Sequence, residues 1–534
     1  MISRKIRPNL LLGCFVFVVV LPAFSQVVDP KRLARDVIAD VAGGNLPKAM
    51  DDLARLLVER PDDLEILFAA AVAHSQKGNI PEAMRFVQEA VSKGLPLERF
   101  LVGPRDLLKP LTESREFQEL CRQSEIRLIH GPMLGCVTPN SAKFWVRTLK
   151  ESTVRVTVSE SERMTLPIFS DEVRTTEKTE YTAVASVKGL RTNTDYFYEI
   201  EIDGIKEPGR WSFRTYPSEG TQAQFQIAFG GGAGYTPEHE RMRNTVRSHE
   251  LSAFLFLGDN VYIDHPTLPA VQQYCYYRRQ SRPEFRAFTS CTGIYAIWDD
   301  HDFVANDGWG GPEIREPEWK IPVWYTFQNQ WNNPAYGGGD ESLPGCWFSF
   351  SIADVDFFLL DGRYYRTDPK QAHPSMLGPM QKEWLLKALK SSKGAFKVLA
   401  SPVAWAFGTK PGSLDTWEGY PEEREEIFSF LEKNRMDGVI LLSADRHRSD
   451  AWRIERPEGY RFYDFESSKL TNIHTHALIP GALFGYNDKC SFGLLTFDTT
   501  KEDPEVSYEI MSIDDELIHK ITLKRSQISH PKAN

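Results

Sequence analysis

Acidic side chains and imidazoles recur directly after short apolar segments in the C-terminal half of the chain. The apolar segments have the length of buried strands, and the polar clusters that follow them include Asp259, Asp300 and Asp445. Ligands in open α/β sheets bind where the carboxyl ends of strands meet their loops, so we expect these clusters to lie together. A single aspartate after a strand is often only a helix cap or a turn residue. Three clusters in succession instead predict an active site: Gly258-Asp259-Asn260-Val261-Tyr262, Asp299-Asp300-His301-Asp302 and Ser443-Ala444-Asp445-Arg446-His447.

The chemistry that these side chains share is metal binding. Carboxylate oxygens and imidazole nitrogens from separate loops are the ligands that hard and borderline cations prefer. Asp445 and His447 stand two positions apart, so on an extended loop they point to the same side. A pair of cations held there would bind phosphoryl oxygens and lower the pKa of a water molecule, and the resulting hydroxide would attack phosphorus. The pattern therefore predicts metal-dependent hydrolysis of phosphate esters, without a serine nucleophile.

Further motifs follow in a fixed order over roughly residues 129–500. Together with the three clusters, and with Asn306 and Arg424, they are Leu360-Asp361-Gly362-Arg363-Tyr364-Tyr365-Arg366, Leu377-Gly378-Pro379-Met380-Gln381-Lys382-Glu383-Trp384-Leu385 and Trp417-Glu418-Gly419-Tyr420. In content, order and spacing the set resembles the alkaline phosphatase D (PhoD-like) family of calcineurin-like metallophosphoesterases. The resemblance implies an α/β fold in which two sheets lie between helices, a four-layer αββα arrangement with a metal cluster at the strand ends.

The resemblance also implies a set of metal ligands. Asp259 would bridge two metal ions, and the tyrosinate of Tyr262 would favour Fe³⁺, with Ca²⁺ as its neighbour; Mn²⁺ and Zn²⁺ are the alternatives. His301 would act with Asp300 in catalysis, stabilising phosphoryl oxygens or protonating the leaving group. The implied ligand positions are Asp259, Tyr262, Asp300, Asp445 and His447.

Two arginines and an asparagine are the predicted substrate contacts. Arg363 and Arg366 are candidates to hold phosphate by charge-assisted hydrogen bonds, and Asn306 belongs to the same implied set. Arg363 has an equally favoured structural interpretation, in which it pairs with Asp361. Both interpretations stay open at this point.

The first motif departs from the family pattern. The family usually carries a cysteine there as an iron ligand, whereas this chain has Gly232. Loss of a thiolate weakens that side of the site, so the resemblance supports iron less strongly than calcium. A second departure is Ala444 in place of the usual glycine. His474 and His476 stand two apart, which is the spacing of a metal-binding pair and equally of exposed or hydrogen-bonding histidines.

These departures keep a second function open. In the alternative, the chain is a catalytically degenerate member of the family that binds a partner protein through its N-terminal helices. Metal content and turnover of a generic phosphate ester separate the two hypotheses. The formal net charge of −10 disfavours a polyanion-binding surface over the whole molecule, and we expect no sequence-specific nucleic-acid binding.

Three structural segments precede or form the predicted enzyme. Residues 27–128 are predicted to be helical and tetratricopeptide-like, because Gly44-Asn45-Leu46-Pro47 recurs as Gly78-Asn79-Ile80-Pro81, 34 residues further on. Alternating strand patterns over 129–217 predict an immunoglobulin-like or fibronectin-like β-sandwich. The predicted catalytic domain covers 223–534.

The N-terminus resembles a secretory signal. Within residues 1–25, a basic start precedes an apolar core and the small residues Ala23 and Ser25, and the core is too short for a comfortable membrane span. An uncleaved anchor and a lipoprotein signal around Cys14 are the alternatives. We therefore expect a secreted or periplasmic protein without a stable membrane span. Because such compartments permit disulfides, Cys275 and Cys291 are the first candidates for a pair.

Overall fold

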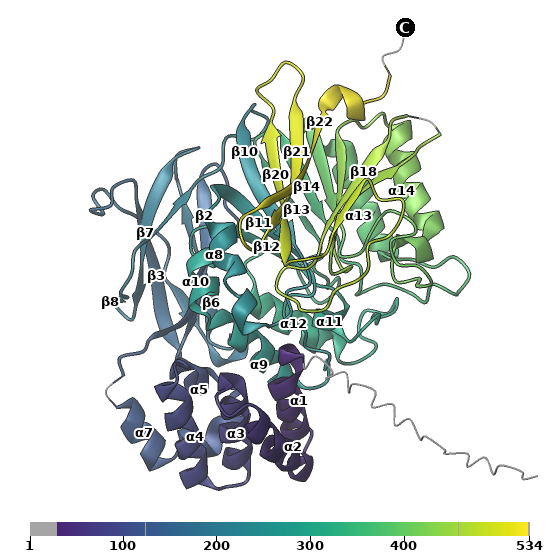
Figure 1. Ribbon diagram of the computed structural model, residues 1–534. Coiled ribbons are helices and arrows are strands. Elements are labelled where there is room, and N and C mark those ends of the chain that lie inside the picture. The colour runs from purple at the N-terminus through teal and green to yellow at the C-terminus, as the bar shows by residue number, and fades with distance from the viewer. Residues whose placement is uncertain (1–28, 123, 458, 532–534) are drawn as a thin grey trace, which may run out of the picture.

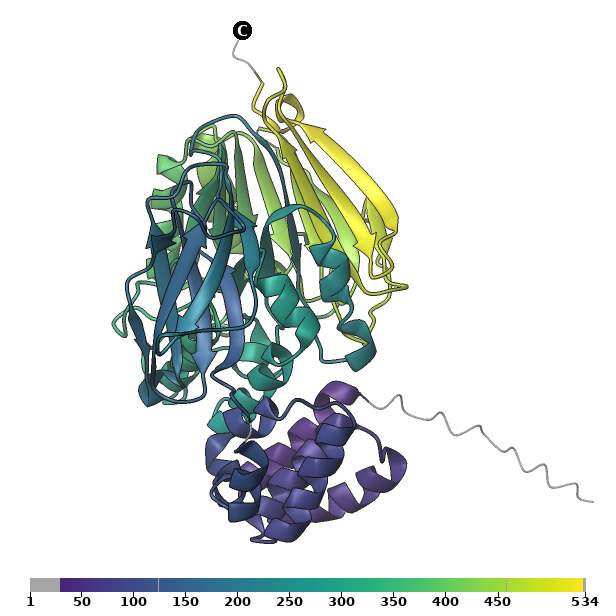
Figure 2. The ribbon, with the colours of Figure 1, turned by 90° about the vertical axis from the view of Figure 1, so that its left-hand side faces the viewer.

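A computed structural model describes residues 29–122, 124–457 and 459–531 of the chain. The secretory signal predicted for residues 1–25 lies outside this part. Helices and several β-sheets are both present, so the mixed α/β class predicted from the sequence is confirmed. The helices of the N-terminal segment lie at one end of the molecule, and the sheets stand above them (Figures 1 and 2).

The N-terminal segment is built from helices with clear start signals, packed around the almost fully buried helix α3 (Leu64–Gln76). Asp29 and Asp63 cap two of them through side-chain bonds to backbone N–H groups. Gly44 and Gly78, both at positive φ, end the preceding helices, which explains why the same turn recurs in the sequence. The tetratricopeptide assignment stays a prediction. The helices are α1 (Pro30–Ala42), α2 (Leu46–Glu59), α3 (Leu64–Gln76), α4 (Ile80–Ser92), α5 (Glu98–Val102), α6 (Arg105–Thr112) and α7 (Arg115–Cys121).

Two antiparallel sheets follow. One has the order β1-β2-β6, and the other has the order β4-β3-β7-β8, with β5 paired to β3 and β9 paired to β7. Phe144 of β2 and Tyr198 of β7 lie 4.5 Å apart between ring centroids, so the two sheets share a core. The immunoglobulin-like assignment remains a prediction. The strands are β1 (Leu128–Gly135), β2 (Ser141–Thr148), β3 (Ser152–Ser159), β4 (Ile168–Phe169), β5 (Val173–Thr175), β6 (Thr182–Lys188), β7 (Asp195–Ile202), β8 (Ile205–Lys206) and β9 (Trp211–Arg214).

The remaining strands form two larger sheets. The six-stranded sheet has the order β12-β11-β10-β20-β21-β22, and the seven-stranded sheet has the order β13-β14-β15-β16-β18-β17-β19. Strands β10 to β12 are parallel, as are β14 to β16 with β18, so their carboxyl ends meet at common edges. The bounds are β10 (Gln224–Gly230), β11 (Leu251–Leu257), β12 (Gly293–Ile297), β13 (Phe348–Ile352), β14 (Val355–Leu359), β15 (Phe396–Ala400), β16 (Val439–Ser443), β17 (Ser449–Ile454), β18 (Phe462–Ser467), β19 (Phe484–Tyr486), β20 (Ser491–Asp498), β21 (Glu505–Ser512) and β22 (Leu517–Lys524).

The two large sheets pack on each other through aromatic side chains. Phe465 of the seven-stranded sheet stacks on Tyr508 of the six-stranded sheet at 4.3 Å. Phe288 packs edge-on against Phe254 on one outer side, and Phe428 contacts Phe462 on the other. Helices therefore cover both outer faces. They are α8 (Met242–Arg247), α9 (Pro269–Gln280), α10 (Pro283–Thr289), α11 (Asp300–Phe303), α12 (Lys320–Gln330), α13 (Gly378–Ser391) and α14 (Pro421–Lys433), with short 3-10 turns at Glu177–Thr179, Pro237–His239, Trp417–Gly419 and Arg525–Ile528.

The helical segment is fixed to the rest of the chain through α9. Tyr274 of α9 donates a 2.8 Å hydrogen bond to Glu65 of α3, and Arg99 binds the same carboxylate at 2.9 Å. Arg278 donates to the backbone oxygen of Lys31 in α1 at 3.3 Å. These buried charged contacts fix the position of α1 against the loops that follow β11.

The predicted Cys275–Cys291 disulfide is wrong. All six cysteines among the described residues are free. Cys275 is buried within α9, with its thiol directed at the backbone oxygen of Tyr262, whereas Cys291 follows α10 and bonds back to Ala287. No helix within residues 29–122, 124–457 and 459–531 combines the length and the apolar character required to cross a membrane.

Candidate metal centre

Asp259 and Tyr262 occupy a tight loop directly after β11. Both residues have positive φ, 55° and 56°, which turns their side chains toward the ends of the neighbouring strands. Asp302 shapes the loop by accepting hydrogen bonds from the backbone N–H groups of Asn260 and Val261, at 2.8 and 3.0 Å. The carboxylate thus replaces the regular backbone partners that the loop lacks.

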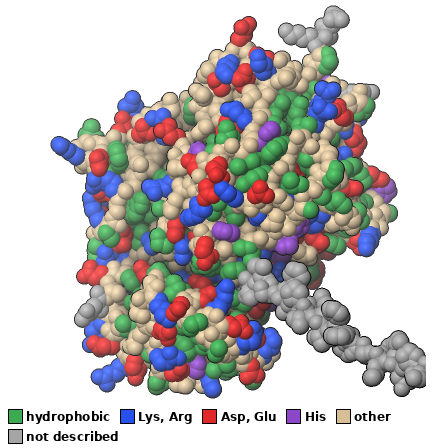
Figure 3. All heavy atoms as spheres, viewed as in Figure 1, with side chains coloured by type: hydrophobic (Ala, Val, Ile, Leu, Met, Phe, Trp, Pro, Cys, Tyr) green, Lys and Arg blue, Asp and Glu red, His purple; other side chains and the backbone are tan. Residues whose placement is uncertain are grey.

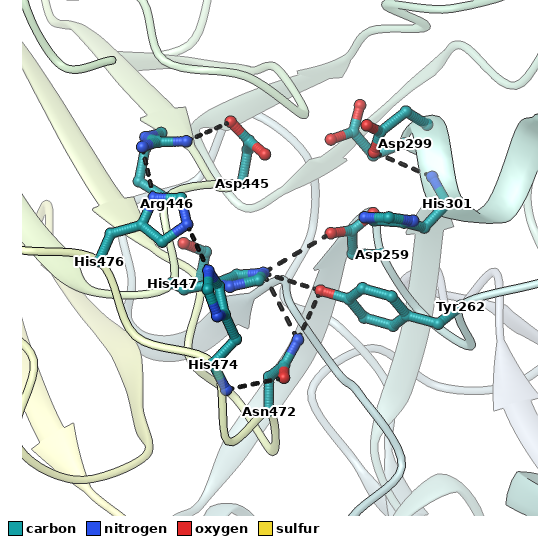
Figure 4. Close-up of polar contacts among 12 residues, drawn as sticks. Asp259, Tyr262, Asp299, His301, Asp445, Arg446, His447, Asn472, His474 and His476 are labelled. Carbon is teal, nitrogen blue, oxygen red and sulfur yellow. Dashed lines mark hydrogen bonds and ion pairs between the residues drawn. The ribbon is translucent and has the colours of Figure 1, made fainter. Parts of the chain in front are cut away.

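The ends of three strands, β11, β12 and β16, bring the predicted ligands to one place (Figure 4). The phenol oxygen of Tyr262 lies 2.8 Å from Nε2 of His447, and the same nitrogen is 4.0 Å from Asp259. Asp259 has a carboxylate oxygen within 4.8 Å of ligand atoms of Asp300 and His301, and within the same distance of oxygens of Asp445 and Asp299. The structure therefore brings together Asp259, Tyr262, Asp300, Asp445 and His447.

The donor set fits bound cations. Oδ1 of Asp259 is buried and has no hydrogen-bond partner among the described residues, and Oδ2 of Asp299 is in the same condition. Burial, with nearby carboxylates, raises the pKa of Asp300 to about 6. Several carboxylates in one buried space cost free energy unless positive charge compensates them. A cation at this place would satisfy the free oxygens and remove that cost.

His301 lies beside this cluster and is oriented by a further carboxylate. Its Nδ1 pairs with Oδ1 of Asp264, and its ring stands 4.5 Å from that of Tyr262. Burial opposes the imidazolium charge, but Asp259, Asp300 and Asp264 outweigh burial and raise the pKa of His301 to about 10. A protonated imidazole at this position can donate to, or neutralise, an anionic oxygen.

The predicted substrate residues are placed differently from one another. Arg363 is fully buried, and its guanidinium binds Asp299 and Asp415, the latter at 2.7 Å. Arg366 also binds Asp415 at 2.7 Å, and its side chain is buried away from solvent. Asn306 is exposed, on the loop after α11.

These contacts favour the structural interpretation of Arg363, with a different partner from the one expected. The guanidinium pairs with Asp299 and Asp415, whereas the backbone N–H of Arg363, and not its side chain, donates to Asp361. Arg363 thereby fixes the carboxylate next to Asp300. Arg363 therefore supports the carboxylate cluster by holding one of its members in place.

Lys410 is a site residue that the sequence did not reveal. Its ammonium group lies 2.9 Å from Asp307, 2.9 Å from Asp415 and 3.4 Å from Asp445. Burial opposes its charge, but these three carboxylates raise the pKa of Lys410. A single lysine in a glycine-containing loop has no distinguishing pattern, so no sequence signal identifies it.

Helix α1 supplies two more residues from the N-terminal segment. Lys31 donates to Oδ1 of Asn472 at 3.1 Å, and its ammonium group stands 4.4 Å from the centre of the Tyr262 ring. Arg35 donates to the backbone oxygen of Tyr262 at 3.0 Å and binds Oδ2 of Asp264. Helix α1 therefore closes one side of the cluster with two basic side chains.

Gly232 lies against the same cluster. A side chain at this position would begin 3.2 Å from the imidazole of His447 and 2.1 Å from the backbone oxygen of Ser468, and the residue has a φ of +61°. The backbone of the loop after β18 therefore fills the space that a β-carbon would need. Glycine is the residue that this packing admits.

A family profile described as PhoD-like phosphatase matches residues 227–510, somewhat more than half of the chain. The chain belongs to the PhoD-like phosphatase family. This confirms the family resemblance that the motifs indicated. A second profile, described as a domain of unknown function (DUF7800), matches residues 125–214 of this PhoD-like protein.

Individual relatives agree with the family assignment. Alkaline phosphatase D of Bacillus subtilis (strain 168) is 24% identical over 335 residues, which cover 53% of this chain and 55% of the relative. The chain thus spans little more than half the length of that protein. The solved structure of PhoD superposes with a TM-score of 0.63 at 17% identity, over 77% of this chain and 93% of the other.

A plant enzyme has a similar fold. Purple acid phosphatase PPD1 from yellow lupin (Lupinus luteus) seeds superposes with a TM-score of 0.54 at 13% identity, over 76% of this PhoD-like chain and 78% of the other. At these identities the two structures establish the fold alone. The ligand assignments rest on the geometry described above.

Proposed function

We propose that this PhoD-like protein is an exported, metal-dependent phosphoesterase that hydrolyses phosphate diesters, monoesters or both. The observation that carries the proposal is the meeting of Asp259, Tyr262, Asp300, Asp445 and His447 at one edge of the two sheets. Such a set of oxygen and nitrogen donors is typical of metal centres that act on phosphate esters. Export is proposed from the signal-like residues 1–25.

The side chains around the centre have separable tasks. Bound cations would withdraw charge from phosphoryl oxygens and make water a stronger acid. His301, charged and held by Asp264, offers a hydrogen bond to a phosphoryl oxygen or a proton to the leaving group. Lys31 and Lys410 add positive charge on two sides of the carboxylates, which favours an anionic substrate.

The residue set also bears on which metals the centre takes. Tyr262 supplies a phenol for Fe³⁺, and the carboxylates suit Ca²⁺, Mn²⁺ or Zn²⁺. With Gly232 in place of a thiolate, we propose that iron is held less firmly than in a site with a cysteine ligand. Arg363 is proposed to position Asp299 and Asp300, and Arg366, buried against Asp415, to hold that carboxylate in place. Asn306, which is exposed, is proposed to influence substrate access.

The test combines elemental analysis with turnover of bis-p-nitrophenyl phosphate on the same purified sample. We expect bound metal, and turnover that a chelator removes. Asp259→Asn and Asp445→Ala should abolish hydrolysis without unfolding the protein. Asp171→Asn, an exposed carboxylate on the sandwich, is the matched control and should keep full activity. Near-normal turnover in both cluster variants would refute the mechanism.

A protein that stays metal-free and inert after addition of iron, calcium, manganese or zinc would support the second function. In that case the chain is a partner-binding relative whose first motif has lost its chemistry at Gly232. Lysine, arginine and acidic side chains are interspersed over the helical segment on the face shown in Figure 3. On this face of the described residues, that mixture differs from the continuous basic stripe that nucleic acids bind.

A further inference from the structure

Three imidazoles meet at the edge of the carboxylate cluster (Figure 4). His474 and His476 belong to the loop after β18, and His447 belongs to the loop after β16. One ring nitrogen of each lies within 4.8 Å of a ring nitrogen of the other two. The two Nε2 atoms of His474 and His476 are 2.9 Å apart. The centroid of the His447 ring stands 5.1 Å from that of His474 and 5.3 Å from that of His476.

We propose that His447, His474 and His476 bind one borderline divalent transition-metal ion, with Zn²⁺ as the preferred species. The proposal goes beyond phosphate-ester hydrolysis, because an imidazole site binds metal whether or not an ester is turned over. It also assigns a role to the loop histidines, which the carboxylate cluster does not use.

The donor type decides which metal the site takes. Neutral imidazole nitrogens suit Zn²⁺, Cu²⁺ and Ni²⁺, whereas Ca²⁺ and Mg²⁺ prefer oxygen ligands. In a tetrahedral zinc site with Zn–N bonds of about 2.0–2.1 Å, ligand nitrogens stand roughly 3.3 Å apart. The Nε2 atoms of His474 and His476 are 2.9 Å apart, so these two rings need to separate only slightly, and the nitrogen of His447 lies within 4.8 Å of both.

The three proposed ligands differ in how far they are buried. His447 is buried; its Nε2 faces Tyr262 and Asp259, and its Nδ1 has no hydrogen-bond partner among the described residues. With the carboxylate cluster occupied through Nε2, the ring would bind the zinc ion through Nδ1 and release its proton to water. His474 is exposed and His476 is half-buried, which leaves a path by which a hydrated ion can enter. Three protein ligands also leave a fourth position of a tetrahedral ion for water.

Surrounding side chains already hold the loop in place. Oδ1 of Asn472 accepts a 3.0 Å hydrogen bond from the backbone N–H of His474. Asn487 donates at 2.8 Å to the backbone oxygen of His476. Contacts of this kind limit the conformational entropy that the loop loses when a metal ion binds.

One contact competes with metal binding. Arg446 donates to Nδ1 of His476, so that ring carries its proton on Nε2. Metal binding through Nε2 shifts the proton to Nδ1, and two donors then face each other. Arginine has no acceptor, so Arg446 must leave His476 when the metal ion binds.

The test uses the full chain, stripped of metal with a chelator and then titrated with Zn²⁺ or with Co²⁺ as a spectroscopic substitute. We expect wild type to bind one more equivalent of Zn²⁺ than His474→Ala/His476→Ala, and to give the visible absorption of four-coordinate Co²⁺. His373→Ala removes an exposed surface histidine that pairs with Glu422 and should behave as wild type. A cooperative thermal unfolding transition, followed by circular dichroism on each metal-free variant, shows that the variant is folded.

Equal Zn²⁺ content in wild type and the double variant would overturn the proposal, whatever the hydrolytic activity. Arg446→Gln supplies an independent measurement because it removes the competing donor. We expect about tenfold tighter Zn²⁺ binding in this variant, within the range that supporting side chains contribute at metal sites. Weaker or unchanged binding would show that His476 is not a ligand.

Discussion

Arg35 and Asp264 form a largely buried ion pair between the N-terminal helix α1 and the loop that follows the first predicted metal-ligand motif. The second oxygen of Asp264 binds Nδ1 of His301, so a guanidinium from the helical segment is linked through one carboxylate to the predicted catalytic imidazole. Arg35 also donates to the backbone oxygen of Tyr262. The helical segment therefore forms part of the wall of the candidate metal centre.

Replacing Arg35 tests this connection. Arg35→Ala leaves Asp264 without the partner that orients it, so His301 is held less firmly. We expect kcat for bis-p-nitrophenyl phosphate to fall by about 10–100-fold, the range for residues that support a metal site, with little change in KM. Arg35→Lys keeps the charge and should retain more activity than the alanine variant.

The matched control for this prediction is Arg32→Ala. Arg32 lies on the same helix, its side chain is 48% exposed and its ionic partner is Asp29. A loss of activity in the Arg32 variant equal to that in the Arg35 variant would indicate a general effect on α1. Full activity of Arg35→Ala would contradict the positioning role.

The raised pKa of His301 predicts a pH-dependent stability of the metal-stripped protein. Although burial lowers this pKa, Asp259, Asp300 and Asp264 raise it from 6.5 to about 10 in the folded state. A raised pKa stabilises the fold fully below the unfolded value and loses its effect as the pH rises through the folded value. The difference in melting temperature between wild type and His301→Asn should therefore be largest below pH 6.5 and nearly vanish at pH 10. A difference that grows with pH would refute the assignment.

Replacing Lys410 is expected to lower the free energy of unfolding. Lys410→Met leaves Asp307, Asp415 and Asp445 without their shared cation, and two of these carboxylates are almost completely buried. We expect a loss of about 1.5–3 kcal/mol, the contribution of a hydrogen bond to a charged group, in the unfolding transition of the catalytic part. Lys387→Met, at an exposed position on α13, should leave that transition unchanged.

The packing around Gly232 predicts that a cysteine at this position destabilises the protein. In Gly232→Cys the new β-carbon meets the backbone oxygen of Ser468 at 2.1 Å, at a positive φ that disfavours side chains. We expect a loss of at least about 1–3 kcal/mol from the backbone conformation alone, and no gain of iron. Gly189→Cys has a similar φ of +76° but open space around it, so it isolates the conformational cost. Stable iron uptake by Gly232→Cys would show that the loop after β18 can move aside.

The sequence alone was enough to predict the type of chemistry and the class of fold. The types of residue that can ligate a cation are few, and their position after apolar segments is a local pattern that needs no knowledge of distant contacts. Asp259, Asp445 and His447 were recognisable for this reason, as was the family. The repeat of the turn at Gly44 and Gly78 was equally local, because each glycine ends a helix in its own neighbourhood.

Only the tertiary structure decided which other residues surround the centre. Arg35 and Tyr262 are 227 positions apart in the chain, and Arg363 and Asp415 are 52 apart, so no spacing rule connects them. The same holds for the partner of Arg363, for which Asp361 was one of two interpretations, and for Cys275 and Cys291, which were the first candidates for a disulfide. Local composition fixes what a side chain can do, whereas its partners depend on how separate segments pack, and that depends on the sum of contacts over the whole chain.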